Sequence, residues 1–195
     1  MESVLNAGGM KLSSPFSEAY VRRALTLSVT NEIYDWFTSA EAWDLVPGSI
    51  EGLSKLTDAG LKLAVLSNSD ERTPVILKAV DLDKYFAFVV FSRSCAHMKP
   101  EAGIFKLVCS RFLGSKVHPE SVLQSQMAQY GHVGDSETRD YWGALHAGCG
   151  RAFLLQRSNS ESCFWAYQDN TPKQFQNLVP PRDRITCLAQ ISERL

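Results

Sequence analysis

The sequence predicts an α/β protein built on a three-layer, Rossmann-like parallel sheet. From about residue 45 onward, apolar runs of strand length alternate with segments whose apolar residues recur at helical spacing. The first run, LKLAVLS, does not alternate between apolar and polar residues, as expected of a strand buried on both faces. The length of 195 residues fits one domain.

Four apolar runs indicate the strands of this sheet. They lie at 61–67, 86–92, 130–135 and 151–156.

Helical periodicity and glycine stops indicate the helices. One helix ends at Gly60, a second begins near Pro74, and a third ends at Gly114. Segment 115–128 is expected to be loop with a short helix, and a helix of small residues should follow residue 135. The polar stretch 157–181 is expected to be irregular surface. The terminal helix should carry four apolar residues on one face: Ile185, Leu188, Ile191 and Leu195.

Composition excludes several functional classes. The formal net charge of −1 offers no bulk attraction for nucleic acid or an anionic membrane. No stretch approaches the roughly 20 apolar residues of a membrane span, and the start of the chain does not look like a signal peptide. Five cysteines without a C-x-x-C pair fit reduced thiols. We therefore expect a cytoplasmic protein without a nucleic-acid or membrane partner.

Polar residues at the strand ends are the candidate functional residues, because ligands bind at the carboxyl ends of parallel strands. The first strand ends in Ser67 and Asn68, where a hydroxyl and neighbouring amides could hold a phosphate oxygen. The alternative is that Ser, Asn and Asp here only cap the next helix.

Two further stretches follow the next strands. Lys99, before Pro100, could neutralise phosphate charge, although Lys-Pro is also a common surface dipeptide. Asp135 and Asp140 lie in GDSETRD after the third strand and could share Mg²⁺, which takes one or two carboxylates plus substrate phosphate. Helix capping by acidic side chains is again the alternative.

The combination of these motifs resembles the haloacid dehalogenase-like (HAD) hydrolase superfamily over about residues 45–156. LAVLSN is similar to the second motif of the family, Lys99-Pro100 to the third and GDSETRD to the fourth. The resemblance implies a Mg²⁺-dependent phosphatase-type hydrolase acting on a small phosphorylated molecule. It assigns Ser67, Asn68 and Lys99 to phosphate, with Ser67 and Lys99 also catalytic, and it assigns Asp135 and Asp140 to the metal.

One family feature is missing from the sequence. Members of the superfamily begin with a central strand carrying D-x-D-x-T, whose first Asp is the nucleophile and whose second is the general acid or base. The first 60 residues contain only Asp35, Asp44 and Asp58, and none follows an apolar strand. Residues 1–46 instead resemble part of a helical cap, and 47–195 resemble the core.

Three explanations for the missing strand stay open. The sequence is a fragment or incomplete gene model, it is a short isoform, or ALTLSVT at 24–30 fills the place of the strand. We expect no meaningful turnover from this chain. The alternative function is a non-catalytic protein that binds phosphate and Mg²⁺, or a partner, on a HAD-like scaffold.

Overall fold

The chain forms two compact units, Met1–Trp43 and Asp44–Leu195. A computed structural model of the protein describes residues 27–114, 118–156 and 178–194. The first unit contains helix α3 (Leu27–Phe37) and a 3₁₀ turn (Ala40–Ala42). The indole of Trp43 donates a 2.8 Å hydrogen bond to the carbonyl of Phe37 and closes this turn on the helix. The assignment of 1–46 to a cap and 47–195 to a core stays a prediction.

The idea that ALTLSVT forms a strand is wrong for its described part. Residues 27–30 belong to α3, and 24–26 lie outside the described residues. The segment continues into NEIYDWF, where Ile33, Tyr34 and Phe37 recur at helical spacing. This periodicity outweighs the local strand preference of Val and Thr, since intrinsic propensity is a weak signal.

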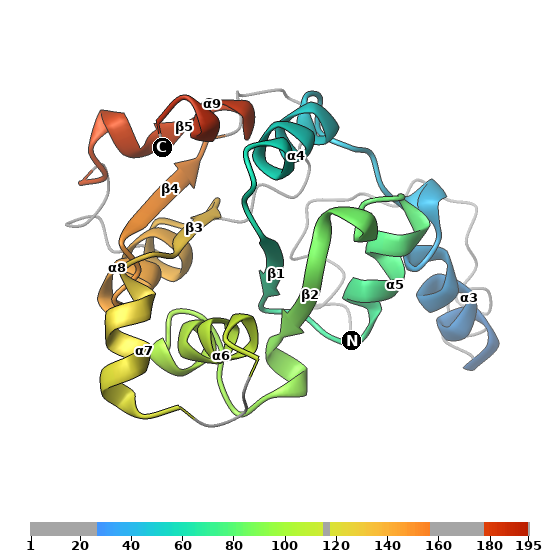
Figure 1. The fold of residues 1–195 in the computed structure, drawn as a ribbon. Helices are drawn as coiled ribbons and strands as arrows, with labels where there is room; N and C mark the ends of the chain where they lie inside the picture. The colour runs from blue at the N-terminus through green and yellow to red at the C-terminus, as the bar shows by residue number, and fades with distance from the viewer. Residues whose placement is uncertain (1–26, 115–117, 157–177, 195) are drawn as a thin grey trace. The chain divides into compact units, whose positions relative to one another are not determined.

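The second unit is a mixed α/β structure in which all strand pairs are parallel (Figure 1). The four predicted strands are confirmed to within two residues at each end. The strands are β1 (Leu63–Ser67), β2 (Phe86–Phe91), β3 (Gly131–Gly134), β4 (Arg151–Leu155) and a short β5 (Arg184–Ile185). Among the described residues they form two separate sheets, β1-β2 and β3-β4-β5, rather than one continuous sheet.

The helices also follow the predicted order. They are α4 (Ser49–Asp58), α5 (Arg72–Ala79), α6 (Ala102–Phe112), α7 (Glu120–Met127), the π-helical turn η5 (Glu137–Trp142), α8 (Gly143–Ala147) and α9 (Ala189–Ser192). Gly60 and Gly114 have φ values of 81° and 74° just beyond α4 and α6. Glycine adopts this left-handed conformation without steric cost, which explains why both helices stop there.

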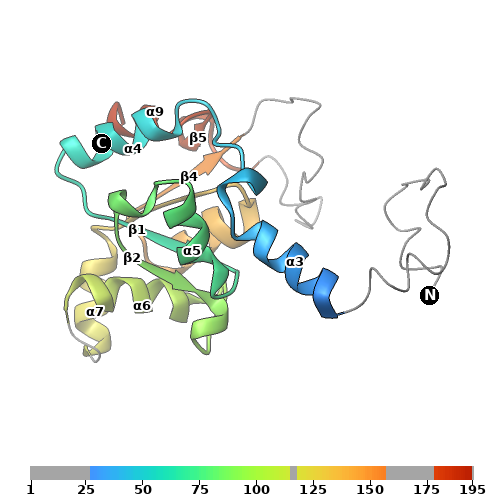
Figure 2. The same ribbon diagram turned by 90° about the vertical axis from the view of Figure 1, so that its right-hand side faces the viewer.

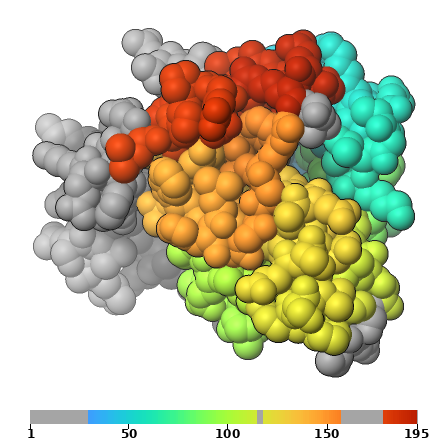
Figure 3. Space-filling view, turned by 60° about the vertical axis from the view of Figure 1, so that its left-hand side comes forward, coloured from blue at the N-terminus to red at the C-terminus, as the bar shows by residue number. Residues whose placement is uncertain are grey.

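Strand β4 is covered on both faces and forms the middle of three layers. Ala152 and Leu154 belong to a core cluster with residues of α6 and α8. Phe153, which points to the opposite face, packs in a second cluster with Leu56 of α4 and Ile191 of α9. The space-filling view shows the C-terminal segment, in red, lying against the segment drawn in orange (Figure 3). Successive residues of β4 therefore pack on opposite faces, and helices cover the strand on both sides.

Strand β1 is less buried than its sequence predicts. All five residues are partly buried, and none is fully buried. The cause is topological, because β1 has a strand neighbour on only one side within the described ranges. An apolar run without alternation is typical of a strand with neighbours on both sides, whereas β1 pairs with one strand in the part of the chain that the structure describes.

The predicted terminal helix is shorter than expected and does not include Ile185. This residue lies in β5, where it pairs with Leu155, and its carbonyl accepts a 2.8 Å hydrogen bond from the amide of Gln156. The spacing of Ile185, Leu188 and Ile191 suggested one helix face. A two-residue strand is too short to leave a pattern that could have shown otherwise.

Two further predictions concern membrane-spanning helices and the cysteines. No helix in the described ranges is long and apolar enough to cross a membrane. Cys95, Cys109, Cys149 and Cys187 are free thiols, as predicted. Cys163 and most of the predicted irregular segment 157–181 lie outside the described residues.

Candidate active site

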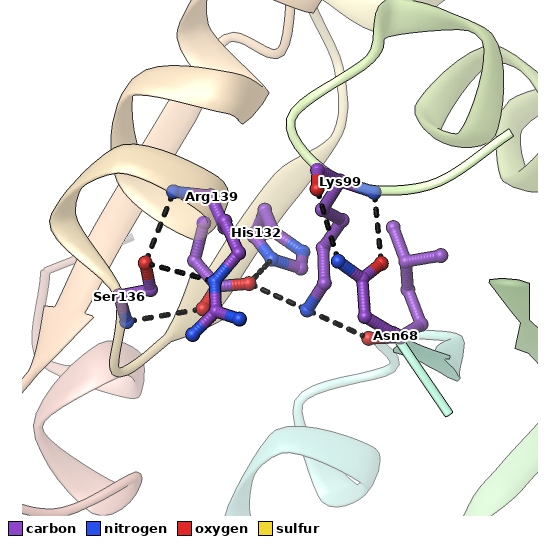
Figure 4. A network of polar contacts seen from close by, with 7 residues as sticks. Asn68, Lys99, His132, Ser136 and Arg139 are labelled. Atoms are coloured by element: carbon purple, nitrogen blue, oxygen red, sulfur yellow. Dashed lines mark hydrogen bonds and ion pairs between the residues drawn. The ribbon is translucent and has the colours of Figure 1, made fainter. Parts of the chain in front are cut away.

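Asn68, the first residue after β1, binds the backbone of Lys99. Its side-chain Nδ2 donates to the Lys99 carbonyl at 2.9 Å, and its Oδ1 accepts from the Lys99 amide at 2.8 Å (Figure 4). These reciprocal bonds join the end of β1 to the loop before α6. The sequence predicted Asn68 near phosphate, and the structure adds that its side chain fixes the position of the lysine.

The side chain of Lys99 is held at the edge of the β1-β2 sheet. Its Nζ lies 2.6 Å from Oδ1 of Asp140 and donates to the carbonyl of Leu66 at 3.1 Å. Only 12% of the Lys99 side chain and 5% of the Asp140 side chain are exposed. Lys99 is therefore largely shielded from water. The alternative, a solvated lysine in a common surface Lys-Pro dipeptide, is wrong.

Asp140 is the centre of this polar cluster. Its Oδ1 also accepts from Nε2 of His132 at 2.9 Å, and its Oδ2 accepts from the amide of Ser136 at 3.1 Å. Burial alone would raise the pKa of the Asp140 carboxyl. The hydrogen bond from His132 and the charge of Lys99 outweigh burial and hold this pKa well below its usual range. The Asp140 carboxyl is thus ionised, and neighbouring N–H groups donate to both of its oxygens.

The glycine of the Gly-Asp motif is required by packing. A Cβ atom added to Gly134 would overlap the side chain of Asp140. The strand end therefore has to be glycine for the carboxylate of Asp140 to lie against it. This contact gives a physical reason for the Gly that precedes Asp135.

His132 is the member of the cluster that the sequence analysis did not assign to the site. Its ring packs edge-on against Phe105 with centroids 5.2 Å apart. It also contacts Asp140, eight residues later. The available signal was a histidine within an otherwise apolar strand, close to the motif that ends that strand.

Helix capping, the alternative role of these polar residues, is also present, but neighbouring residues perform it. Ser136 caps η5, because its Oγ accepts from the amide of Arg139 at 3.1 Å and from its Nε at 3.3 Å. After β1, the carboxylate of Asp70 accepts from the amide of Arg72 and forms a 2.6 Å ion pair with its guanidinium. The hydrogen bonds from Arg72 lower the pKa of Asp70 against a smaller effect of burial.

Ser67 and Asp135 stand at the ends of β1 and β3. The side chain of Ser67 is partly buried, and Asp135 is exposed. A hollow of about 570 Å³ opens beside the end of β1, and its lining includes Asn68, Ser69 and Arg93. The hollow is shallow, and its lining does not include Ser67, Lys99, Asp135 or Asp140.

A Mg²⁺ site requires carboxylate oxygens that can bind the metal. Within the described ranges, no three His, Cys, Asp or Glu side chains form a ligand cluster. Both oxygens of Asp140 already accept N–H groups. Mg²⁺ commonly binds one or two carboxylates, several waters and substrate phosphate, so the assignment of Asp135 and Asp140 to the metal stays a prediction.

Comparison with known proteins gives the family. A family model for haloacid dehalogenase-like hydrolase matches residues 10–148. Haloacid dehalogenase-like hydrolase domain-containing protein 3 of Xenopus laevis is 37% identical over 138 residues, covering 71% of this chain and 52% of that protein. The protein of the same name from Bos taurus is 32% identical over 176 residues, covering 87% of this chain and 64% of that protein.

The sequence segments IYDWFTSAEAWDLVPGSIEGL and KPEAGIF predicted a resemblance to this domain-containing protein 3 group, and the prediction is confirmed. The chain spans between about half and two thirds of the length of these two relatives.

A solved structure shows the same fold. The HAD phosphatase from Thermococcus onnurineus aligns with a TM-score of 0.59 and 23% identity, covering 85% of this chain and 63% of that one. At this identity the likeness concerns the fold, and the family rests on the sequence matches. The chain belongs to the haloacid dehalogenase-like hydrolase family.

Proposed function

We propose that this chain carries the phosphate- and Mg²⁺-binding part of a phosphatase-type HAD site and that by itself it hydrolyses no phosphate ester. The observation that carries the proposal is the anchored Lys99 ammonium, held by Asp140 and the Leu66 carbonyl beside the strand ends. A fixed cation that is largely shielded from water stabilises anionic phosphate more strongly than a solvated lysine.

The other residues have distinct roles in this proposal. The Ser67 hydroxyl donates to a phosphoryl oxygen, and the backbone after it offers amide donors. Asn68 positions Lys99 through its two backbone contacts. Bound Mg²⁺ would supply charge neutralisation on the phosphate, with Asp135 as its protein ligand.

Asp140 acts by positioning in this proposal rather than by binding metal directly. Its oxygens hold Lys99, His132 and the amide of Ser136. These contacts keep the ammonium aligned and fix the turn that carries Asp135. These contacts favour support of the site over the direct metal ligation that the resemblance implies for Asp140.

The expected absence of turnover rests on the chemistry that the superfamily uses. Covalent phosphoryl transfer in this superfamily needs a nucleophilic carboxylate. Asp35 lies within α3 and Asp58 ends α4, and Asp44 follows the 3₁₀ turn rather than a strand. We expect no Mg²⁺-dependent hydrolysis of p-nitrophenyl phosphate by the purified chain. Robust hydrolysis that Asp135→Asn abolishes would contradict this part of the proposal.

Binding is tested separately from turnover. We expect titration calorimetry to detect inorganic phosphate binding that is stronger with Mg²⁺ present, and Asp135→Asn to remove the effect of Mg²⁺. Asp81→Asn, an exposed carboxylate elsewhere, is the matched control and should bind as the native chain does. Unchanged calorimetry in Asp135→Asn would instead favour a scaffold whose strand-end residues only cap helices.

The second candidate function is a non-catalytic binding protein for a small phosphorylated molecule. It is favoured by one observation, that the Lys99 ammonium already has a carboxylate partner in Asp140. Phosphate binding without turnover is expected of both candidates, and binding retained over a panel of phosphorylated small molecules would support this one.

A further inference from the structure

The C-terminal segment, residues 178–194, contacts the turn η5 that follows the Gly-Asp motif. Glu137 of η5 forms an ion pair with Arg184, and its Oε1 lies 3.4 Å from a guanidinium nitrogen. Tyr141 of the same turn donates a 2.6 Å hydrogen bond to the carboxylate of Asp183. Because Asp183 and Arg184 are neighbours in the chain, both contacts hold η5 from the same side.

Arg184 is itself fixed in place. It belongs to β5, which pairs with β4 and lies beside it in the turned view (Figure 2). The next residue, Ile185, is almost fully buried in the second core cluster. Nε of Arg184 donates to the carbonyl of Val179 at 3.0 Å, and Arg194 donates to the Arg184 carbonyl at 2.8 Å. With its backbone and guanidinium both held, Arg184 can fix the position of η5.

The Glu137 carboxylate depends on this cation. Only 16% of the Glu137 side chain and 19% of the Arg184 side chain are exposed. Among the residues that the structure describes, the second oxygen of Glu137, Oε2, is buried without a hydrogen-bond partner. A largely buried carboxylate that loses its cation is costly. Loss of Arg184 should therefore turn Glu137 toward water and shift the turn that carries it.

A shift of η5 would reach the candidate metal ligand. Asp135 lies two residues before Glu137 and is exposed, which suits a carboxylate that binds Mg²⁺ together with several waters. The other end of η5 is held separately, because Asp140 binds Lys99 and His132. Removal of a group that orients a metal ligand typically weakens metal binding by roughly 10- to 100-fold.

We infer that Arg184 and Asp183 are positioning residues of the Mg²⁺ site, which hold η5 through Glu137 and Tyr141 so that Asp135 can bind the metal. The inference rests on the proposed function, which gives the metal to Asp135. Arg184 and Asp183 act through the turn and touch neither phosphate nor metal in this scheme. They extend the site to a part of the chain that carries none of its motifs.

The test compares the affinity for Mg²⁺ with the affinity for phosphate on the full chain. Calorimetry measures Mg²⁺ titrated into chain saturated with inorganic phosphate, and separately phosphate titrated without Mg²⁺. We expect Arg184→Met to weaken Mg²⁺ binding about tenfold. Phosphate binding without Mg²⁺ should change less than about twofold, since Lys99 keeps its contacts with Leu66 and Asp140. Equal weakening of both titrations would indicate a general loss of folded protein and would overturn the inference.

The sign of the change separates positioning from charge. A cation near a metal site repels Mg²⁺, so an Arg184 that acted only through its charge would give tighter Mg²⁺ binding once replaced by Met. Tighter or unchanged binding in Arg184→Met would therefore overturn the inference. The matched control is Arg182→Met, in the same segment, because 86% of the Arg182 side chain is exposed. This control should bind Mg²⁺ as the native chain does, and a loss equal to that of Arg184→Met would also overturn the inference.

Two further outcomes are distinguishable. If Arg184→Met does not fold, Tyr141→Phe decides, because it removes only the hydroxyl that binds Asp183. It should weaken Mg²⁺ binding about threefold, and unchanged binding would overturn the inference. If Asp135→Asn removes the effect of Mg²⁺ and Arg184→Met keeps it, the inference alone is wrong. If the native chain shows no effect of Mg²⁺ on phosphate binding, the proposed function is wrong and the inference falls with it.

Discussion

Lys99 and Asp140 are 41 residues apart in sequence, and their side chains meet in a 2.6 Å ion pair that is largely shielded from water. The pair joins the loop after the β1-β2 sheet to the turn after β3. The two sheets share no strand pairing in the described part of the chain. This contact therefore links the two halves of the candidate site.

Removing the cation should leave a buried charge without compensation. We expect Lys99→Met to lower the free energy of unfolding by about 3 kcal/mol, since breaking a buried pair costs more than the pair contributes. Urea denaturation measures this change.

The exposed pair Lys55–Glu51 gives the matched control. Lys55→Met should leave the urea midpoint nearly unchanged, because solvent screens surface pairs. Equal losses in the two variants would show that the Lys99 pair has no special importance.

The Asp140 carboxyl should make stability depend on acid pH. Its pKa is lowered in the folded state, so its contribution is complete above the unfolded value of about 3.9 and is lost as pH falls toward the folded value. Asp140→Asn should therefore be less stable than the native chain at pH 7, with a difference that shrinks below about pH 4. Urea denaturation from pH 7 to pH 3 measures this, and a constant difference would contradict it.

Gly134 should tolerate no side chain. Gly134→Ala places a methyl group against Asp140, and we expect a loss of about 2 kcal/mol in the free energy of unfolding. Gly131→Ala in the same strand is the control, since the nearest atom to its added Cβ is 3.9 Å away. Thermal and urea denaturation of both variants tests the contact, and similar stability of the two would rule it out.

The Tyr141 hydroxyl should make stability depend on alkaline pH. Its hydroxyl donates a 2.6 Å hydrogen bond to Asp183, and burial together with this bond raises the pKa of Tyr141 to about 12. The contribution is complete below the unfolded value of about 10 and is lost as pH rises toward the folded value.

Tyr141→Phe should therefore be less stable by about 1 kcal/mol at pH 8, with a difference that declines above about pH 10. Denaturation at pH 8, 10 and 11 provides the measurement. A difference that grows with pH would have the wrong sign.

Local patterns predicted the elements well but failed at two places. Ile185 was assigned to a helix because its spacing from Leu188 fits one, yet it pairs with Leu155 in a parallel ladder. The residues 27–30 were considered for a strand, yet they begin α3. Strand β5 has only two residues, too few for spacing to reveal it, and in α3 the helical spacing that follows residue 30 outweighs the local strand preference of Val and Thr.

The candidate site was predicted in its parts and not in its connections. The sequence singled out Lys99 and Asp140 because each follows an apolar strand. It did not assign His132 to them, and it did not show that the amide of Asn68 holds the lysine backbone. Such contacts join residues from different elements and leave no mark in local periodicity.

The sequence by itself determined the α/β class, the order of strands and helices, and the family, because periodicity and motif order are properties of neighbouring residues. Tertiary structure alone decided that Lys99 is paired with Asp140, that Gly134 is a packing requirement and that Arg184 is paired with Glu137. These features depend on which elements the topology brings together, and that is fixed by burial and backbone pairing over the whole chain.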